Sequence, residues 1–154
     1  SLLKSFEIQL LADIRTLPGS NRFPHFNKPA LEQSLHTAGI DYIHIPDLGG
    51  RRRPRPDSKN TVWRNKAFQG YADYMETDTF KNAIEQLGRL AQAKRTAYMC
   101  SEAVWWRCHR SLVSDYLKVH GWTVMHIMDK GKSTEHPYTS PARLVQGDLF
   151  YNEE

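Results

Sequence analysis

The sequence contains little cysteine and no long apolar run. Its two cysteines, Cys100 and Cys108, are too few among 154 residues for a disulfide framework, and they favour a reducing, cytoplasmic location. No apolar run approaches the roughly 20 residues that a membrane-spanning helix needs. The first residues also lack the basic segment, long apolar run and small-residue cleavage site of a signal peptide. The sequence therefore predicts neither a membrane-bound protein nor a secreted disulfide-rich scaffold.

The length and composition predict a single domain over residues 1–154. Hydrophobic residues make up 40% of the chain and charged residues 25%, which are ordinary fractions for a globular protein. A chain of this length buries roughly 68–70% of the surface that it exposes when unfolded. We therefore expect the domain to be stable without a structural metal or a disulfide.

Positive charge is concentrated in one segment. The net charge is +4, and between residues 51 and 66 the only acid, Asp57, is far outnumbered by basic residues. These are Arg51, Arg52, Arg53, Arg55, Lys59, Arg64 and Lys66. A basic cluster that also contains an aromatic residue, Trp63, can attract the phosphates of nucleic acid. A solvated loop that keeps the protein soluble is the alternative, and the sequence leaves both open.

Apolar patterning predicts strands alternating with helices. The predicted strands are 7–14, 40–45, 95–100 and 122–128, with a short one at 142–145. The predicted helices are 29–38, two within 68–94 of which the second starts near Thr77, and 106–120. This alternation predicts an α/β fold: a three-layer, mainly parallel sheet flanked by helices, Rossmann-like and doubly wound. The stretch 47–62 is predicted to be a long loop, and such loops are often functional.

In folds of this kind ligands bind at the carboxyl ends of the strands. Asp13 and Arg15 follow the first predicted strand, and the third runs into "YMCSEAVWWRCHRSLVSDYL", residues 98–117. Here Cys100 and Glu102 fall in the turn before a helix, whose N-terminus can receive an anion. Four interpretations of this stretch stay open: a nucleophilic or acid–base site, a metal site, a thiol redox pair, and an ordinary structural turn.

Spacing separates these four interpretations. Cys100 and Arg107 are one residue further apart than the Cys-x5-Arg of a cysteine-phosphatase loop. No Cys-x2–4-Cys pair favours zinc, and no Cys-x-x-Cys favours redox chemistry, so we predict no metal site. Cys108 lies four residues before Leu112 on the apolar helical stripe, which favours a place in the core. Cys100 is then the thiol expected to face the site.

The segments "DIRTLPGSNRFPHF", "LGGRR", "WRNKAFQGYADYM", "CSEAVWWRCHRSL" and "EHPYTSPARLV" together resemble the bacterial family labelled domain of unknown function 488. The resemblance runs from about Leu10 to Val145 and implies an α/β domain without an established activity. Members usually begin with a further strand, approximately Thr-Ile-Gly-His-Ser, followed by a helix, and this chain starts at what looks like the end of that helix. The resemblance therefore implies that the first strand and its histidine are absent. An uncovered sheet edge favours pairing with a second copy of the chain.

These observations predict a small enzyme that acts on an anionic, phosphate-bearing ligand, a nucleotide or a base in nucleic acid. The residues expected to catalyse the reaction are Cys100, Glu102, His109 and Asp13. Those expected to bind the anion or the base are Arg15, Arg51, Arg64, Asn65, Tyr71, Trp105, Trp106 and Arg110. The alternatives are a non-catalytic nucleic-acid-binding domain that uses the 51–66 loop and a metalloprotein. The sequence identifies no cofactor.

Overall fold

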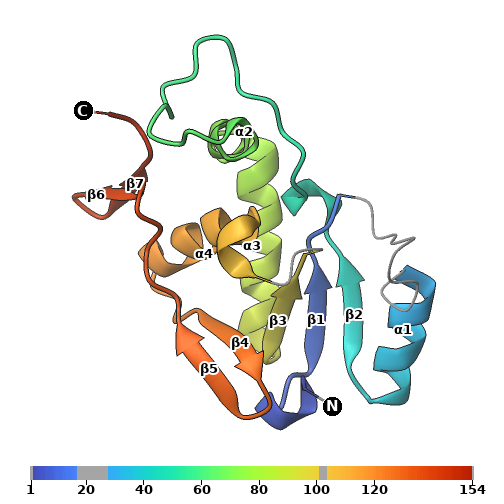
Figure 1. The fold of residues 1–154 in the computed structure, drawn as a ribbon. Helices are drawn as coiled ribbons and strands as arrows, with labels where there is room; N and C mark the ends of the chain where they lie inside the picture. The colour runs from blue at the N-terminus through green and yellow to red at the C-terminus, as the bar shows by residue number, and fades with distance from the viewer. Residues whose placement is uncertain (1, 17–27, 101–103, 154) are drawn as a thin grey trace.

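A parallel sheet of three strands lies at the centre of the protein, whose computed structural model describes residues 2–16, 28–100 and 104–153 (Figure 1). The strands are β1 (Leu10–Asp13), β2 (Asp41–His44) and β3 (Thr96–Met99). Their order is β2-β1-β3, with Leu10 of the central strand opposite Asp41 on one side and Thr96 on the other. β3 is therefore an outer strand of this sheet.

The helices connect and cover these strands. They are α1 (Lys28–Thr37), α2 (Lys66–Tyr74), α3 (Asp78–Ala93) and α4 (Arg110–Val119), with the short 3-10 helices η1 (Lys4–Phe6), η3 (Pro46–Leu48) and η4 (Trp105–Arg107). Thr77 caps α3 by accepting a hydrogen bond from Phe80 N at 3.2 Å, which confirms the helix start predicted there. None of the helices in the described ranges has the length and apolar character that crossing a membrane requires.

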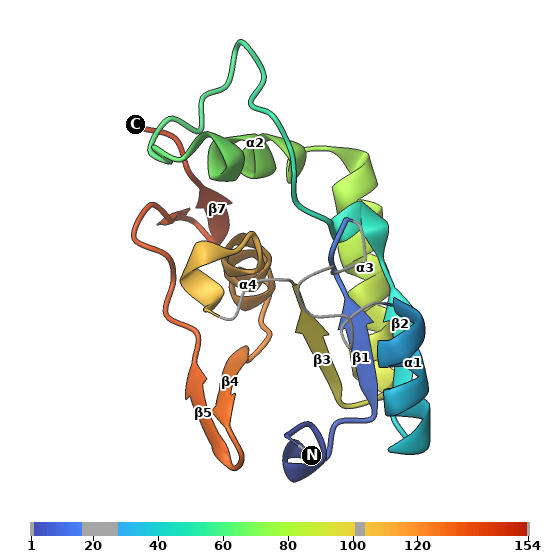
Figure 2. The ribbon, with the colours of Figure 1, turned by 45° about the vertical axis from the view of Figure 1, so that its right-hand side comes forward.

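The two faces of the sheet bury different helices. Leu11 packs with Leu31 and Leu35 of α1, whereas its neighbour Ala12 belongs to a larger cluster with Ile84 of α3 and Leu112 of α4. Successive side chains of a strand point to opposite faces, so α1 lies against one face and α3 and α4 lie toward the other (Figure 2). The predicted α/β architecture, with a parallel sheet flanked by helices, is confirmed.

The fourth predicted strand, 122–128, is a strand in the structure, but its place in a parallel sheet was predicted wrongly. β4 (Met125–Asp129) pairs antiparallel with β5 (Lys132–Glu135), and β6 (Arg143–Val145) pairs antiparallel with β7 (Asp148–Phe150). Gly131, with φ +67°, supplies the left-handed conformation that a tight hairpin turn requires. The doubly wound, Rossmann-like arrangement is therefore not confirmed.

The chain after Asp129, which the sequence pattern predicts to be mostly loop, contains three short strands among the described residues. The predicted strand at 142–145 corresponds to β6, whereas the partner strands β5 and β7 were not predicted. β5 reads Lys-Ser-Thr-Glu and has no apolar alternation, so its sequence gives no strand signal. The pairing of this chain with a second copy through a sheet edge stays a prediction.

Candidate functional site

The carboxyl end of β1 holds a buried ion pair. Arg15 Nε donates to Asp13 Oδ1 at 2.9 Å and Arg15 Nη2 to Asp13 Oδ2 at 2.6 Å. Tyr42 OH donates to the same Oδ2 at 2.6 Å. Burial alone would raise the pKa of Asp13, but the hydrogen bonds from Arg15 and Tyr42 outweigh burial and lower it. The pair has the geometry of a structural ion pair, because both charged groups already have protein partners.

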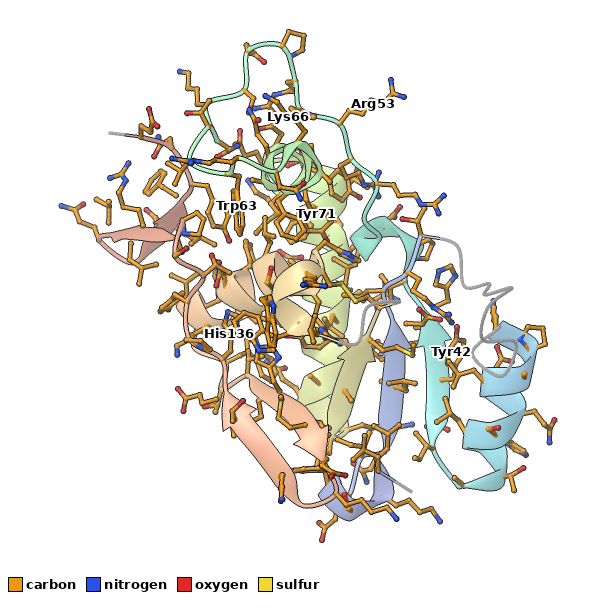
Figure 3. The ribbon with its side chains drawn as sticks, viewed as in Figure 1. Tyr42, Arg53, Trp63, Lys66, Tyr71 and His136 are labelled. Carbon is orange, nitrogen blue, oxygen red and sulfur yellow. A yellow bond between two sulfur atoms is a disulfide. The ribbon has the colours of Figure 1, made fainter. Side chains whose placement is uncertain are left out.

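The two cysteines are not separate thiols. Cys100, directly after β3, and Cys108, directly before α4, are joined in a disulfide, and each is at most 6% exposed (Figure 3). Cys108 belongs to the core cluster, as predicted, but so does Cys100, so the expectation that Cys100 faces the site is corrected. A disulfide-bonded sulfur is not a thiolate, so Cys100 supplies no nucleophile in this state. Glu102 lies outside the described residues.

His109 connects the start of α4 to the sheet. Its Nε2–H donates to the carbonyl oxygen of Ile14 at 3.0 Å, and its ring lies 4.9 Å from that of Tyr71 between centroids. Burial is the main cause that lowers the pKa of His109 to about 4. The imidazole is therefore neutral at pH 7 and holds two elements together, which is the structural role that the sequence left open for it.

Two further predicted ligand-binding residues also have protein partners. Tyr71 is 1% exposed and donates its hydroxyl hydrogen to the carbonyl oxygen of Leu48 at 2.7 Å. Burial raises the pKa of Tyr71 well above its ordinary value. Asn65 is the N-cap of α2 and accepts from Ala67 N at 2.8 Å. Trp63, the aromatic residue within the basic segment, packs edge-on against Phe68 with ring centroids 5.0 Å apart.

The basic segment 51–66 is tied to α2 through Asp73. This buried carboxylate accepts from Arg55 N at 2.8 Å, from Ser58 Oγ at 2.7 Å and from Asn60 Nδ2 at 2.6 Å. The guanidinium of Arg52 lies 3.7 Å from the ring centroid of Tyr74, and this second contact also holds the segment against α2. The exposed cations on this held loop are Arg51, Arg53, Arg55, Lys59, Arg64 and Lys66. Figure 3 shows Arg53 pointing away from the body of the protein.

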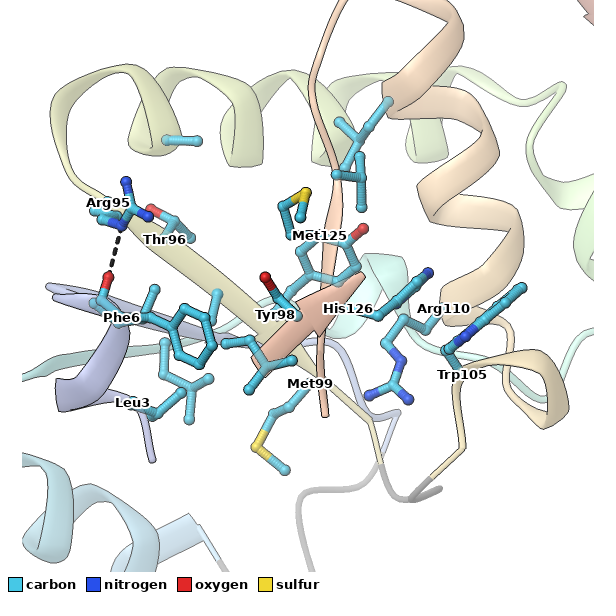
Figure 4. A pocket seen from close by; sticks show the side chains of 18 of the residues that line it. Leu3, Phe6, Arg95, Thr96, Tyr98, Met99, Trp105, Arg110, Met125 and His126 are labelled. Carbon is cyan, nitrogen blue, oxygen red and sulfur yellow. Dashed lines mark hydrogen bonds between the residues drawn. The ribbon is translucent and has the colours of Figure 1, made fainter. Parts of the chain in front are cut away.

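A cavity of about 850 Å³ lies beside β3, between that strand and β4 (Figure 4). Most of its wall is apolar, with Leu87 and Val124 among the lining residues. Three lining residues carry polar groups at one end of the cavity: Tyr98, Arg110 and His126. The cavity therefore combines a broad apolar wall with a few convergent polar groups, as ligand sites commonly do.

Two indoles border the polar end of this cavity. Trp105 stacks on His126 with ring centroids 4.5 Å apart and an interplanar angle of 5°. Trp106, 52% exposed, meets Trp105 edge-on at 5.6 Å. The structure thus brings together three of the predicted binding residues, Trp105, Trp106 and Arg110, whereas Arg15 and Tyr71 lie in the buried networks described above.

Burial keeps two of the polar groups in the cavity wall, His126 and Tyr98, uncharged at pH 7. Burial is the main cause that lowers the pKa of His126 to about 4, and electrostatic interactions with His136 and Arg110 lower it further. Burial also raises the pKa of Tyr98 to about 12, while its hydroxyl shares a hydrogen bond with Ser114 Oγ at 2.7 Å. At pH 7 the cavity consequently presents a neutral imidazole and a neutral phenol next to the guanidinium of Arg110.

The sequence analysis missed a buried cluster behind this cavity. Asp115 of α4 accepts a hydrogen bond from His136 Nε2 at 2.8 Å, and His136 Nδ1 lies 2.7 Å from His126 Nε2. The one available signal was the position of His126 between apolar neighbours in a predicted strand. Across the described ranges, no group of three or more His, Cys, Asp or Glu side chains is arranged to hold a metal ion.

The fold and the site define an α/β protein that has a lined cavity beside an outer strand of its parallel sheet. The chain belongs to the family described as "Domain of unknown function DUF488", whose model matches residues 1–117. No curated protein and no solved structure matches the chain significantly. The resemblance drawn from the sequence motifs is confirmed. The match ends within α4, so both hairpins follow it along the chain.

Proposed function

We propose that the chain is a small enzyme whose cavity beside β3 binds a phosphate-bearing ligand, a nucleotide or a base in nucleic acid. The observation that supports this proposal is that Arg110, His126 and Trp105 line one end of a single cavity. A guanidinium suits the planar, paired hydrogen bonds of a phosphate. An indole offers a face on which a nucleobase stacks, and a neutral imidazole can accept a proton.

The arrangement favours His126, and not His109, as the residue that transfers a proton. Cys100 is disulfide-bonded and His109 donates to the backbone, whereas His126 lines the cavity. We therefore assign proton transfer to His126 and binding of the anion to Arg110. Trp106, exposed at the rim, is assigned to hold the base.

Arg110→Gln is expected to weaken nucleotide binding by about 10- to 100-fold, because a charge-assisted hydrogen bond contributes about 1.5–3 kcal/mol. The measurement is a thermal-shift titration with the nucleoside 5′-monophosphates and short oligonucleotides. A ligand that binds only the folded state raises the Tm as its concentration rises. Arg107→Gln, on the neighbouring exposed arginine, is the matched control and should bind as the unaltered protein does. An Arg110→Gln variant that binds equally well would contradict the proposal, as would a panel without any Tm increase.

A second candidate function is sequence-independent binding of nucleic acid by the 51–66 loop. The observation that favours it is the Asp73 network, which holds the loop against α2 while cationic side chains face outward. A preformed cationic surface binds phosphates without the entropic cost of ordering a loop.

Replacing Arg53 and Arg64 together by glutamine should reduce the salt dependence of such binding. Each phosphate contact contributes about 0.9 to the slope of log K against log salt for duplex DNA and about 0.7 for single strands. Fluorescence anisotropy over a salt series measures this slope, and we expect the double variant to lower it by about 1.4–1.8. The matched control replaces Lys130 and Lys132, exposed on the β4–β5 hairpin. Equal slopes for both double variants, or no binding at low salt, would reject a role for the loop.

A further inference from the structure

Behind the cavity, three side chains form a continuous chain of hydrogen bonds. Asp115 and His136 are both fully buried, and His126 is 7% exposed. The links are His136 Nε2 to Asp115 Oδ1 at 2.8 Å and His126 Nε2 to His136 Nδ1 at 2.7 Å. This chain of hydrogen bonds starts on α4, passes through His136 after β5 (Figure 3) and ends at His126 of β4 in the cavity wall (Figure 4).

The direction of these hydrogen bonds follows from the surroundings of Asp115. Besides His136, its carboxylate accepts from Thr139 N at 3.0 Å, from the hydroxyl of Thr139 and from Tyr151 OH at 2.7 Å. A backbone N–H can only donate, so Asp115 Oδ1 is an acceptor. His136 must then carry its hydrogen on Nε2, and in the neutral ring Nδ1 accepts from Nε2–H of His126.

This order leaves Nδ1 of His126 without a hydrogen. Throughout residues 2–16, 28–100 and 104–153, no group makes a hydrogen bond to that nitrogen. Trp105 lies flat against the ring and fixes its plane, and His126 lines the cavity. The charged and titratable groups around the ring are His136 behind it and Arg110 and Tyr98 in the cavity wall.

We propose that Asp115 and His136 fix the tautomer of His126, so that its unprotonated Nδ1 is the hydrogen-bond and proton acceptor of the cavity. The site would therefore take a ligand that places an N–H or O–H group against His126. When Nδ1 accepts that proton, the electron pair of the broken bond stays on the ligand atom. The Nε2 proton of His126 passes to Nδ1 of His136, and the positive charge comes to rest next to the carboxylate of Asp115. This inference rests on the proposed function only for the identity of the ligand.

The first test is ¹⁵N NMR of the histidine rings at pH 7, which distinguishes the two neutral tautomers and the charged form. We expect His126 and His136 to carry hydrogen on Nε2 and none on Nδ1. His120, exposed and hydrogen-bonded locally to Tyr116 O, is the internal control for a ring outside the relay. An Nδ1–H tautomer of His126, or a doubly protonated His136 at pH 7, would overturn the proposal.

The second test is Asp115→Asn, which separates the charge of Asp115 from its shape. The asparagine oxygen should stay opposite Thr139 N, because that backbone donor cannot reverse, so both tautomers should be retained. Loss of the negative charge should lower the pH at which the two rings take up a proton by about one unit or more. An unchanged titration would overturn the relay. Neither measurement needs a ligand, so failure of the nucleotide titrations leaves this test standing, and failure here leaves nucleotide binding intact.

Discussion

Asp115→Ala is expected to lower the free energy of unfolding by about 3–5 kcal/mol. The carboxylate is fully buried and accepts hydrogen bonds from His136, Thr139 and Tyr151. Alanine would leave these donors without an acceptor in a place that water does not reach. Each unsatisfied buried donor costs about 1–3 kcal/mol, and this cost is larger than the worth of the hydrogen bond itself.

Urea denaturation followed by circular dichroism measures this loss. The matched control is Asp148→Ala, because Asp148 is an exposed aspartate in the same C-terminal part of the chain. We expect the control to change the free energy of unfolding by no more than about 0.5 kcal/mol. Tyr151→Phe, which removes one of the donors to Asp115, should fall between the two variants. A loss below about 1 kcal/mol for Asp115→Ala would show that the cluster relaxes or hydrates without cost.

The size of this expected effect follows from what Asp115 joins. His136 directly follows β5 along the chain, and Thr139 and Tyr151 come from the tail beyond it. One carboxylate on α4 therefore ties three residues of the C-terminal part of the chain to the body of the protein. The same contacts place His126 at the cavity wall, so stability and the proposed chemistry depend on one residue.

Much of the fold could be predicted because its signals are local. Thr77 marks a helix start through a hydrogen bond to a donor three residues away, and it caps α3 in the structure. The β4 strand shows the limit of local reasoning. Its alternating pattern predicts a strand, but the choice between the parallel sheet and a hairpin depends on what covers each edge, which no local pattern records.

The site was predicted in part for the same reason. The strand-end rule located the turn after β3, and Trp105 and Arg110, which follow this turn along the chain, both line the cavity. The rule also selected Asp13 and Arg15, which neutralise each other. The sequence does not record which side chains contact each other in the fold. It therefore predicted that Asp13 and Arg15 would bind a ligand, and not that they would bind each other. Asp115, His126 and His136 lie up to 21 positions apart along the chain and carry no motif spacing.

Gly70→Ala is expected to lower the free energy of unfolding by about 1–3 kcal/mol and to displace the basic loop from α2. A Cβ atom at Gly70 would lie 2.6 Å from the carbonyl carbon of Arg52 and closer still to its oxygen. Both atoms belong to the backbone, so no side-chain rotation relieves the clash. The loop has to move, and its hydrogen bonds to Asp73 have to stretch or break.

Gly88→Ala is the matched control, since both glycines lie within helices. A Cβ atom at Gly88 would meet only Trp122 Cζ2, at an ordinary 3.8 Å. Because alanine favours the helix by about 1 kcal/mol over glycine, this variant should be as stable as the unaltered protein or more stable. Urea denaturation compares the two variants, and limited trypsin digestion reports the loop, whose arginines and lysines become cleavable once it leaves α2. Equal stability and equal digestion of both variants would mean that the loop is not held by its contact with Gly70. If the loop is displaced but nucleotide binding is unchanged, the cavity binds its ligand independently of the basic loop. This result would distinguish the two functions proposed for this chain.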